Sequence, residues 1–120
     1  MNANLRVCIA YAAGRGISGK PFSGVYDYSR SKQIAMSGSI TTDHIDIYDP
    51  AQNHHLSGDG NGSRYDLHYD GEPKPITLEM RDSGFRGCDH GSSFHFSGRV
   101  QTNSVFLYDC ENGLSFRFGI

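Results

Sequence analysis

Tryptophan is absent from this sequence of 120 residues, and long apolar runs are absent too. No stretch approaches the run of about 20 apolar residues that a membrane-spanning helix needs, so no membrane association is expected. Cysteine is scarce, because Cys8, Cys88 and Cys110 are the only three and no two have the spacing of a zinc knuckle. The sequence therefore predicts no disulfide framework, and we expect a reduced, cytoplasmic protein.

An excess of basic residues is also missing. The 11 lysines and arginines are opposed by 13 aspartates and glutamates, which gives a formal net charge of −2. Nucleic-acid-binding domains carry a basic footprint, so no nucleic-acid partner is expected. The glycine-rich stretch from Gly14 to Lys20 lacks the spacing and the following helix of a phosphate-binding loop. The sequence therefore indicates no cofactor.

Glycine and aromatic residues are what the chain has in quantity. It contains 15 glycines, 7 tyrosines and 7 phenylalanines. Aromatic side chains favour strands and glycines favour turns. Because the length is that of one ordinary domain, we expect residues 1–120 to form a single all-β domain.

The most apolar stretch is VCIAYAA, from Val7 to Ala13. It is short for the core of a secretory leader, only Arg6 stands before it, and charged residues follow. A short continuous apolar run is consistent with a buried strand. We therefore expect a strand from Leu5 to Ala12, with a leader as the alternative.

A Tyr-Asp pair recurs with a period of about 20 residues, which is typical of repeat architectures. The units are FSGVYDYSRSKQIAMSGSI, HIDIYDPAQNHHLSGDG, RYDLHYDGEPKPITLEM, GFRGCDHGSSFHFSGRV and SVFLYDCENGLSFRFGI. In the fourth unit the pair becomes Cys88-Asp89. Apolar and polar residues alternate on both sides of each pair, and turn-forming residues follow it, so each unit predicts one β-hairpin.

Five hairpins in series predict an antiparallel up-and-down meander of about ten strands. A sheet of that size twists, and it either closes into a barrel or folds over into a sandwich. Closure has the advantage that it removes exposed strand edges. No segment shows a useful helical period, so no helix longer than two turns is expected.

Antiparallel pairing with like-facing apolar residues arranges the inward side chains in rows. The first row is Val25, Met36, Ile47, Leu56, Leu67, Leu78, Gly87, Phe96, Leu107 and Phe116. The second row is Ser23, Gly38, Ile45, Gly58, Tyr65, Met80, Phe85, Gly98, Val105 and Phe118. Large and small residues alternate in the second row, as in a barrel interior filled by side chains. We expect Leu56, Leu78, Phe96, Leu107 and Phe116 to be buried together.

A third row lies one step nearer the Tyr-Asp turns: Asp27, Ile34, Asp49, His54, Tyr69, Ile76, Asp89, Phe94, Asp109 and Leu114. It gathers four carboxylates at one mouth of the barrel. Each Asp is explained either as a turn residue that accepts backbone N–H groups or as part of an acidic mouth that binds a cation or a basic ligand group. The candidate ligand-binding residues are Asp27, Asp49, His54, Tyr69, Asp89 and Asp109. No catalytic residue and no metal site is singled out.

The units resemble small uncharacterised bacterial proteins built from Tyr-Asp β-hairpin repeats, in which an aromatic residue or histidine precedes Ser-Gly, as in SSFHFSGRV. The resemblance covers residues 22–120, and it implies the hairpin fold but no functional residue. The segment LYDCENGLSF is also similar to the Tyr-Asp repeats of the large Rhs-type toxin shells, which need many more than five repeats. A weaker similarity to the choline-binding repeats of cell-wall proteins lacks their tryptophans.

Two kinds of function fit these patterns. The first is a non-catalytic binding or interaction module on a small β-barrel, in which the outward aromatics Tyr26, Tyr48, Phe106 and Tyr108 contact a ligand or form a homo-oligomer interface. The alternative is a ligand-binding or hydrolytic enzyme that uses an acidic cavity at the Tyr-Asp end of the barrel. A filled interior favours the first, and a pocket lined by carboxylates favours the second.

Overall fold

The computed structural model of the protein describes all 120 residues, which form one helix and eleven strands. The helix is α1 (Ala3–Ser18), and it comes first in the chain. The strands are β1 (Gly24–Asp27), β2 (Lys32–Ala35), β3 (Ser37–Ile40), β4 (His44–Asp49), β5 (His54–Gly60), β6 (Arg64–Tyr69), β7 (Ile76–Arg81), β8 (Gly84–Asp89), β9 (Phe94–Gln101), β10 (Ser104–Asp109) and β11 (Leu114–Gly119).

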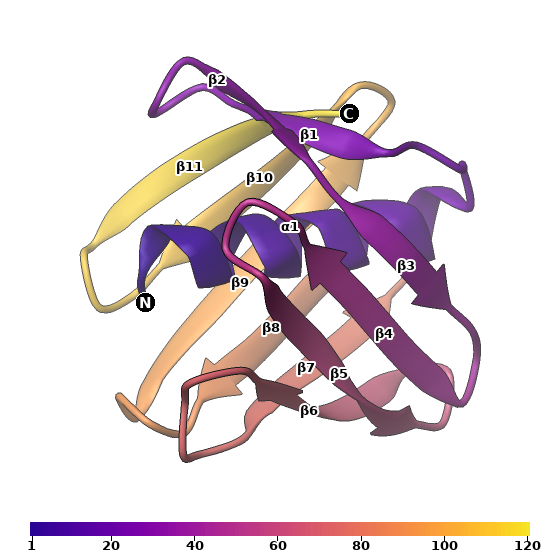
Figure 1. Cartoon of the computed structure of the whole chain (residues 1–120), viewed down its shortest axis with the longest axis vertical. Coiled ribbons are helices and arrows are strands. Elements are labelled where there is room, and N and C mark those ends of the chain that lie inside the picture. Colours follow the sequence, from indigo (N-terminus) through magenta and orange to yellow (C-terminus); the bar gives the residue numbers. More distant parts are fainter.

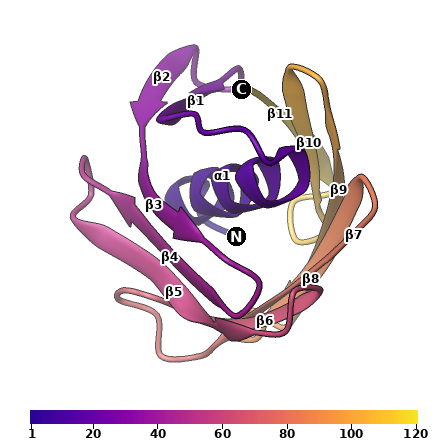
Figure 2. The same cartoon turned by 90° about the vertical axis from the view of Figure 1, so that its right-hand side faces the viewer.

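The strands form a single antiparallel sheet that nearly closes into a barrel (Figure 1, Figure 2). Their order is β2-β1-β11-β10-β9-β8-β7-β6-β5-β4-β3, so the last strand of the chain pairs with the first. The two ends of this order, β2 and β3, are consecutive in the chain and are separated only by Met36. One bent segment thus joins both edges of the sheet. The predicted all-β antiparallel meander is confirmed, and it is a barrel rather than a sandwich.

The helix α1 runs through the barrel and fills it (Figure 2). The predicted strand from Leu5 to Ala12 is therefore wrong, and so is the expectation that no helix exceeds two turns, because α1 has 16 residues. All residues from Val7 to Gly14 are buried, since strands surround the helix on every side. A helix covered all round is apolar all round, so its sequence shows no helical period and resembles a buried strand.

Local sequence fixes where α1 begins and ends. Asn2 is the N-cap, and its side chain accepts a hydrogen bond from the Leu5 amide at 2.8 Å. The alanines within the helix have the strongest helix propensity. Gly19 ends the helix in the left-handed conformation with φ 70°, and its amide donates to the Arg15 carbonyl at 2.9 Å. No helix of the structure is both long enough and apolar enough to span a lipid bilayer.

The predicted register has the correct inward parity in every strand. The pairs Ile47 with Leu56 and Leu107 with Phe116 are confirmed. Between β5 and β6, however, Leu67 pairs with Gly58 instead of the predicted Leu56, and similar two-residue shifts occur at β1–β2, β3–β4, β6–β7 and β9–β10. A shift of two leaves each side chain on its own face. Barrel closure requires such stagger between strands, which the local pattern does not encode.

The barrel core consists of α1 and the inward rows of the sheet. Leu56, Leu78, Phe96 and Leu107 are buried there, as predicted. Phe116 is only half-buried, which corrects the prediction that it is buried with them, and its ring lies under the Arg6 guanidinium at 3.9 Å. The helix thus supplies the layer of side chains that the sheet alone does not.

Glycines make room for aromatic rings between the sheet and α1. Gly87 pairs with Phe96, and Gly98 on the next strand pairs with Phe85. A Cβ at either glycine would collide with the partner's ring and with a carbonyl of the strand on its other side. The alternation of large and small residues in the predicted rows therefore reflects the space that the rings need.

Candidate functional site

The four aspartates of the predicted mouth lie at one end of the barrel. Asp27, Asp49, Asp89 and Asp109 are the last residues of β1, β4, β8 and β10. These strands run in the same direction, because an even number of antiparallel pairings separates any two of them. All four side chains are buried. The structure therefore brings the predicted carboxylates to one end, around the first turns of α1.

Each of these aspartates accepts a hydrogen bond from the amide two residues further along the chain. The Oδ1–N distances are 3.0 Å from Asp27 to Ser29, 3.1 Å from Asp49 to Ala51, 3.1 Å from Asp89 to Gly91 and 3.0 Å from Asp109 to Glu111. This is the local turn geometry that aspartate favours. The repeated Asp is thus accounted for by a repeated turn.

The third unit departs from this pattern by one residue. Tyr69, rather than Asp70, takes the inward position, and its hydroxyl lies 3.1 Å from His54 Nδ1. His54 pairs with Asp49 across the β4–β5 ladder, so three predicted site residues are neighbours. Burial raises the pKa of Tyr69, and the nearby Cys8 and Asp49 raise it further. The phenol therefore stays protonated at neutral pH.

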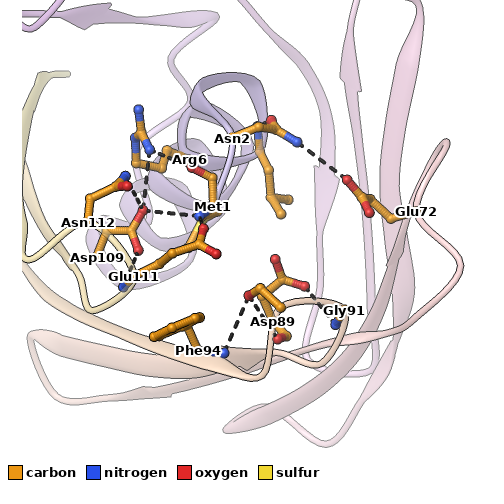
Figure 3. A network of polar contacts seen from close by, with 12 residues as sticks. Met1, Asn2, Arg6, Glu72, Asp89, Gly91, Phe94, Asp109, Glu111 and Asn112 are labelled. Carbon is orange, nitrogen blue, oxygen red and sulfur yellow. Dashed lines mark hydrogen bonds and ion pairs between the residues drawn. The ribbon is translucent and has the colours of Figure 1, made fainter.

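The centre of the mouth is occupied by the helix itself (Figure 3). Arg6 Nη1 lies 3.3 Å from Asp109, and the amino group of Met1 lies 3.4 Å from the same carboxylate. Asn2 donates to Glu72 at 3.5 Å. A ring of carboxylates at the N-terminal end of α1 also complements the helix dipole. Five surface hollows of about 280 to 570 Å³ lie on the barrel, and none of them is lined by one of the four aspartates.

Replacing Asp27 with Asn is expected to cost about 1–2 kcal/mol at pH 7, because Asp27 combines turn capping with a 2.7 Å ion pair to Arg30, a cation that Asp49 lacks. Asp49→Asn, which keeps an oxygen for Ala51, is expected to cost less than about 1 kcal/mol. Burial by itself raises the pKa of Asp27, but hydrogen bonds from Ser29 and Arg30 outweigh it and lower that pKa. Because the pKa of Asp27 is lower in the folded state than in the unfolded state, its carboxylate stabilises the protein above pH of about 4. That stabilisation is lost as the pH falls from there through the folded-state pKa.

Thermal melts of the two variants from pH 7 downward test this explanation. The difference in melting temperature between the parent and Asp27→Asn should narrow below pH of about 4. A parent melting temperature that rises with added calcium or magnesium, and no longer does so in either variant, would contradict capping and support the acidic mouth.

A second group of reactive side chains lines an outer hollow of about 440 Å³ across β7 to β10. Cys88 Sγ lies 4.0 Å from His90 Nδ1, and His90 Nε2 lies 2.9 Å from Thr77 Oγ1. His95 pairs with Cys88 from the next strand, and Cys110 lines the same hollow. Burial, followed by the Asp89 charge, raises the pKa of Cys88, which disfavours a thiolate nucleophile. No three metal-ligating side chains converge here or elsewhere.

The most distinctive outer surface lies on β9, β10, β11 and the end of β1. We call it the arginine–aromatic face, and it consists of Tyr26, Tyr28, Arg99, Phe106, Tyr108 and Arg117. The sheet register places Arg99, Phe106 and Arg117 side by side on three strands. The Arg99 guanidinium lies 4.8 Å from the Phe106 ring, and that of Arg117 lies 4.6 Å from the Tyr28 ring. Cations and aromatic rings therefore alternate across the strands.

The arginine–aromatic face has no carboxylates, whereas a second outer face of the barrel has several. The outward positions of β9, β10, β11 and β1 contain no Asp or Glu. The acidic–histidine face lies on the outer side of β4 to β7 and consists of His44, Asp46, His55, Asp59, Arg64, Asp66, His68, Glu79 and Arg81. The outer surface of the barrel is thus divided by charge, although the chain as a whole is nearly neutral.

The four predicted outward aromatics all point away from the core, but they do not lie on one face. Tyr26, Phe106 and Tyr108 lie on the arginine–aromatic face, but Tyr48 lies on β4, where its ring contacts His55 with centroids 4.7 Å apart. The arginines were missed, because Arg99 and Arg117 are 18 positions apart in the sequence and meet Phe106 only through strand pairing. The sequence signal for these arginines was the alternation within each unit, which places Arg99 and Arg117 among the outward residues but does not show what they contact.

No family model, no curated protein and no solved structure matches the chain.

Proposed function

We propose that this protein is a non-catalytic binding module, a solid barrel that presents its arginine–aromatic face to a protein partner rich in carboxylates. The observation that carries the proposal is the alternation of Arg99, Phe106, Arg117 and Tyr28 on a face without any carboxylate. The unpaired cysteines fit the reducing cytoplasm as its place of action.

The filled interior supports a binding module over an enzyme. The helix α1 takes the space in which a barrel of this kind would otherwise hold a small ligand. The aspartates at the mouth are hydrogen-bonded to their own turns, and Asp109 is additionally paired with Arg6. The four aspartates line none of the five surface hollows of about 280 to 570 Å³, which supports a binding site on the outer surface over a hydrolytic site at the mouth.

The composition of the arginine–aromatic face is that of interface cores, in which Tyr, Phe and Arg are enriched. Tyr28 and Tyr108 are large aromatic side chains with 48% and 43% exposure. The Phe106 and Tyr28 rings hold the two guanidinium groups in place, and Arg117 Nε also donates to Ser104 Oγ at 3.2 Å, which leaves the Nη groups for a carboxylate. Less side-chain entropy is then lost when a carboxylate binds.

The partner we expect is an acidic protein surface. Two arginines are too few to neutralise the row of phosphates that a nucleic acid presents, and the chain carries a net charge of −2. A protein surface with a few carboxylates around an apolar centre matches both the charge and the rings of this face.

Titration of the ¹⁵N-labelled protein with poly-L-glutamate at low salt tests the proposal. Amide shifts are expected on β9, β10, β11 and β1, since Arg99 and Arg117 lie on this face and its outward strand positions carry no carboxylate. Arg99→Gln with Arg117→Gln should weaken binding roughly 5–10-fold, in line with two partly exposed charge contacts.

The matched control is Arg64→Gln with Arg81→Gln, which removes the same charge from the acidic–histidine face. It should leave the affinity within about a factor of two, which is the spread expected of distant surface charges. Shifts that map instead to the mouth around Asp89 and Asp109, or to the hollow at Cys88, would refute the proposal.

A further inference from the structure

The two outer faces of the barrel are complementary to each other in charge. The arginine–aromatic face carries Arg99 and Arg117 and no carboxylate. The acidic–histidine face carries four carboxylates, Asp46, Asp59, Asp66 and Glu79, against the two arginines Arg64 and Arg81. One face is therefore net positive and the other net negative.

These faces lie on opposite sides of the barrel, with β9 to β11 across from β4 to β6 (Figure 2). Five pairings separate β10 from β5 in a sheet of eleven strands. A single copy thus has no means of bringing its own two faces together. Both faces consist of outward side chains, so both are accessible to another molecule.

We infer that the partner of the arginine–aromatic face is a second copy of this chain, which offers its acidic–histidine face. This inference rests on the proposed function and names the occupant of the same surface. Arg99 and Arg117 then bind carboxylates of the second copy. Phe106 and Tyr28 pack against the second copy beside these ion pairs.

Exposed carboxylates are available for this contact. Asp66 is 71% exposed in its side chain, and its nearest cation, Arg64, lies 3.9 Å away. Asp46 is 51% exposed in its side chain and lies 3.3 Å from His55 Nδ1. Surface pairs of this kind contribute little within one copy, so exchanging them for a guanidinium contact with another copy costs little.

The contact is heterologous, since each copy uses a different face. One copy can therefore bind a neighbour on each side, and the assembly grows as a row unless its rotation closes a ring. Four strands of about six residues cover roughly 20 by 20 Å, so two faces bury about 800 Å² in total. That area lies below the roughly 1,200 Å² of stable interfaces, so we expect weak, concentration-dependent association.

Sedimentation velocity at about 20 mM and about 500 mM salt tests the inference over protein concentrations from about 0.05 to 1 mM. The parent should gain average mass with concentration at low salt and remain monomeric at high salt, because salt screens exposed charges. Two variants separate the faces: Arg99→Glu with Arg117→Glu has two acidic faces, and Asp46→Lys with Asp66→Lys has two basic faces.

Each variant alone should stay monomeric, whereas their equimolar mixture should associate at least as well as the parent, because acidic and basic faces then alternate between copies. Lys20→Glu with Lys74→Glu is the matched control, since both lysines are exposed and lie outside the two faces. This control should associate like the parent. Circular dichroism confirms that every variant is folded.

The second-copy inference is overturned if the parent stays monomeric at low salt, if the mixture does not recover association, or if the control loses as much as the face variants. A monomeric parent that still binds poly-L-glutamate through Arg99 and Arg117 overturns this inference and leaves the proposed function standing. A parent that neither associates nor binds the polymer overturns both.

Discussion

Replacing Ala12 with Glu is expected to leave the protein unfolded at 25 °C. Ala12 is fully buried in the middle of α1, where strands enclose the helix on all sides. A carboxylate there has neither solvent nor a cationic partner, and burying such a charge costs more than the 5–15 kcal/mol that stabilises a typical domain. Loss of the near-ultraviolet circular dichroism signal and collapse of amide dispersion measure the result.

Two further variants keep this test quantitative. Ser18→Glu places the same charge in the last turn of α1, where the residue is half-buried, and should cost less than about 1 kcal/mol. Ala12→Gly should stay folded and lose about 1 kcal/mol through lower helix propensity. A folded Ala12→Glu protein with a melting temperature near that of the parent would show that α1 does not form the core of the barrel.

Replacing Phe96 with Ala is expected to lower the free energy of unfolding by about 3–5 kcal/mol, as for other buried aromatic side chains. Phe96 is 1% exposed and lies on β9 opposite Gly87, whose missing side chain makes room for its ring. Truncation leaves a cavity next to a glycine, which has no side chain to fill it. The melting temperature should fall by roughly 10–20 °C.

Phe94→Ala is the matched control on the same strand and with the same inward parity. Phe94 is 44% exposed, because it lies at the mouth opposite Asp89, beyond the packed core. Its loss should stay below about 1 kcal/mol, as for exposed sites. Similar losses for the two variants would mean that depth along the strand does not separate core from rim in this barrel.

The candidate mouth could be predicted from the sequence, but whether it is open to a ligand or filled by the chain could not. Asp49 and Asp89 each begin a turn, and alternation alone places both side chains inward at one end. The sequence left two explanations open, because turn capping and cation binding use the same carboxylates. Only the position of α1, with Arg6 beside Asp109, shows that the chain fills this end itself.

The arginine–aromatic face needed the tertiary structure. Arg99, Phe106 and Arg117 belong to three strands, and which of them meet depends on stagger between strands rather than on the alternation within one. At β9–β10 that stagger differs by two residues from the register predicted with unstaggered rows. The inward or outward direction of each side chain survives such a shift, but its neighbours do not.

The sequence by itself determined the hairpins, their turns and the inward parity of every strand, because each of these depends on residues within one repeat unit. Only the tertiary structure decided that residues 3–18 form a helix and that the meander closes around it. The segment from Val7 to Gly14 is apolar on all faces, so its own pattern favours neither a helix nor a strand. The barrel encloses a space that a helix fills, and a strand added to its edge would leave that space empty.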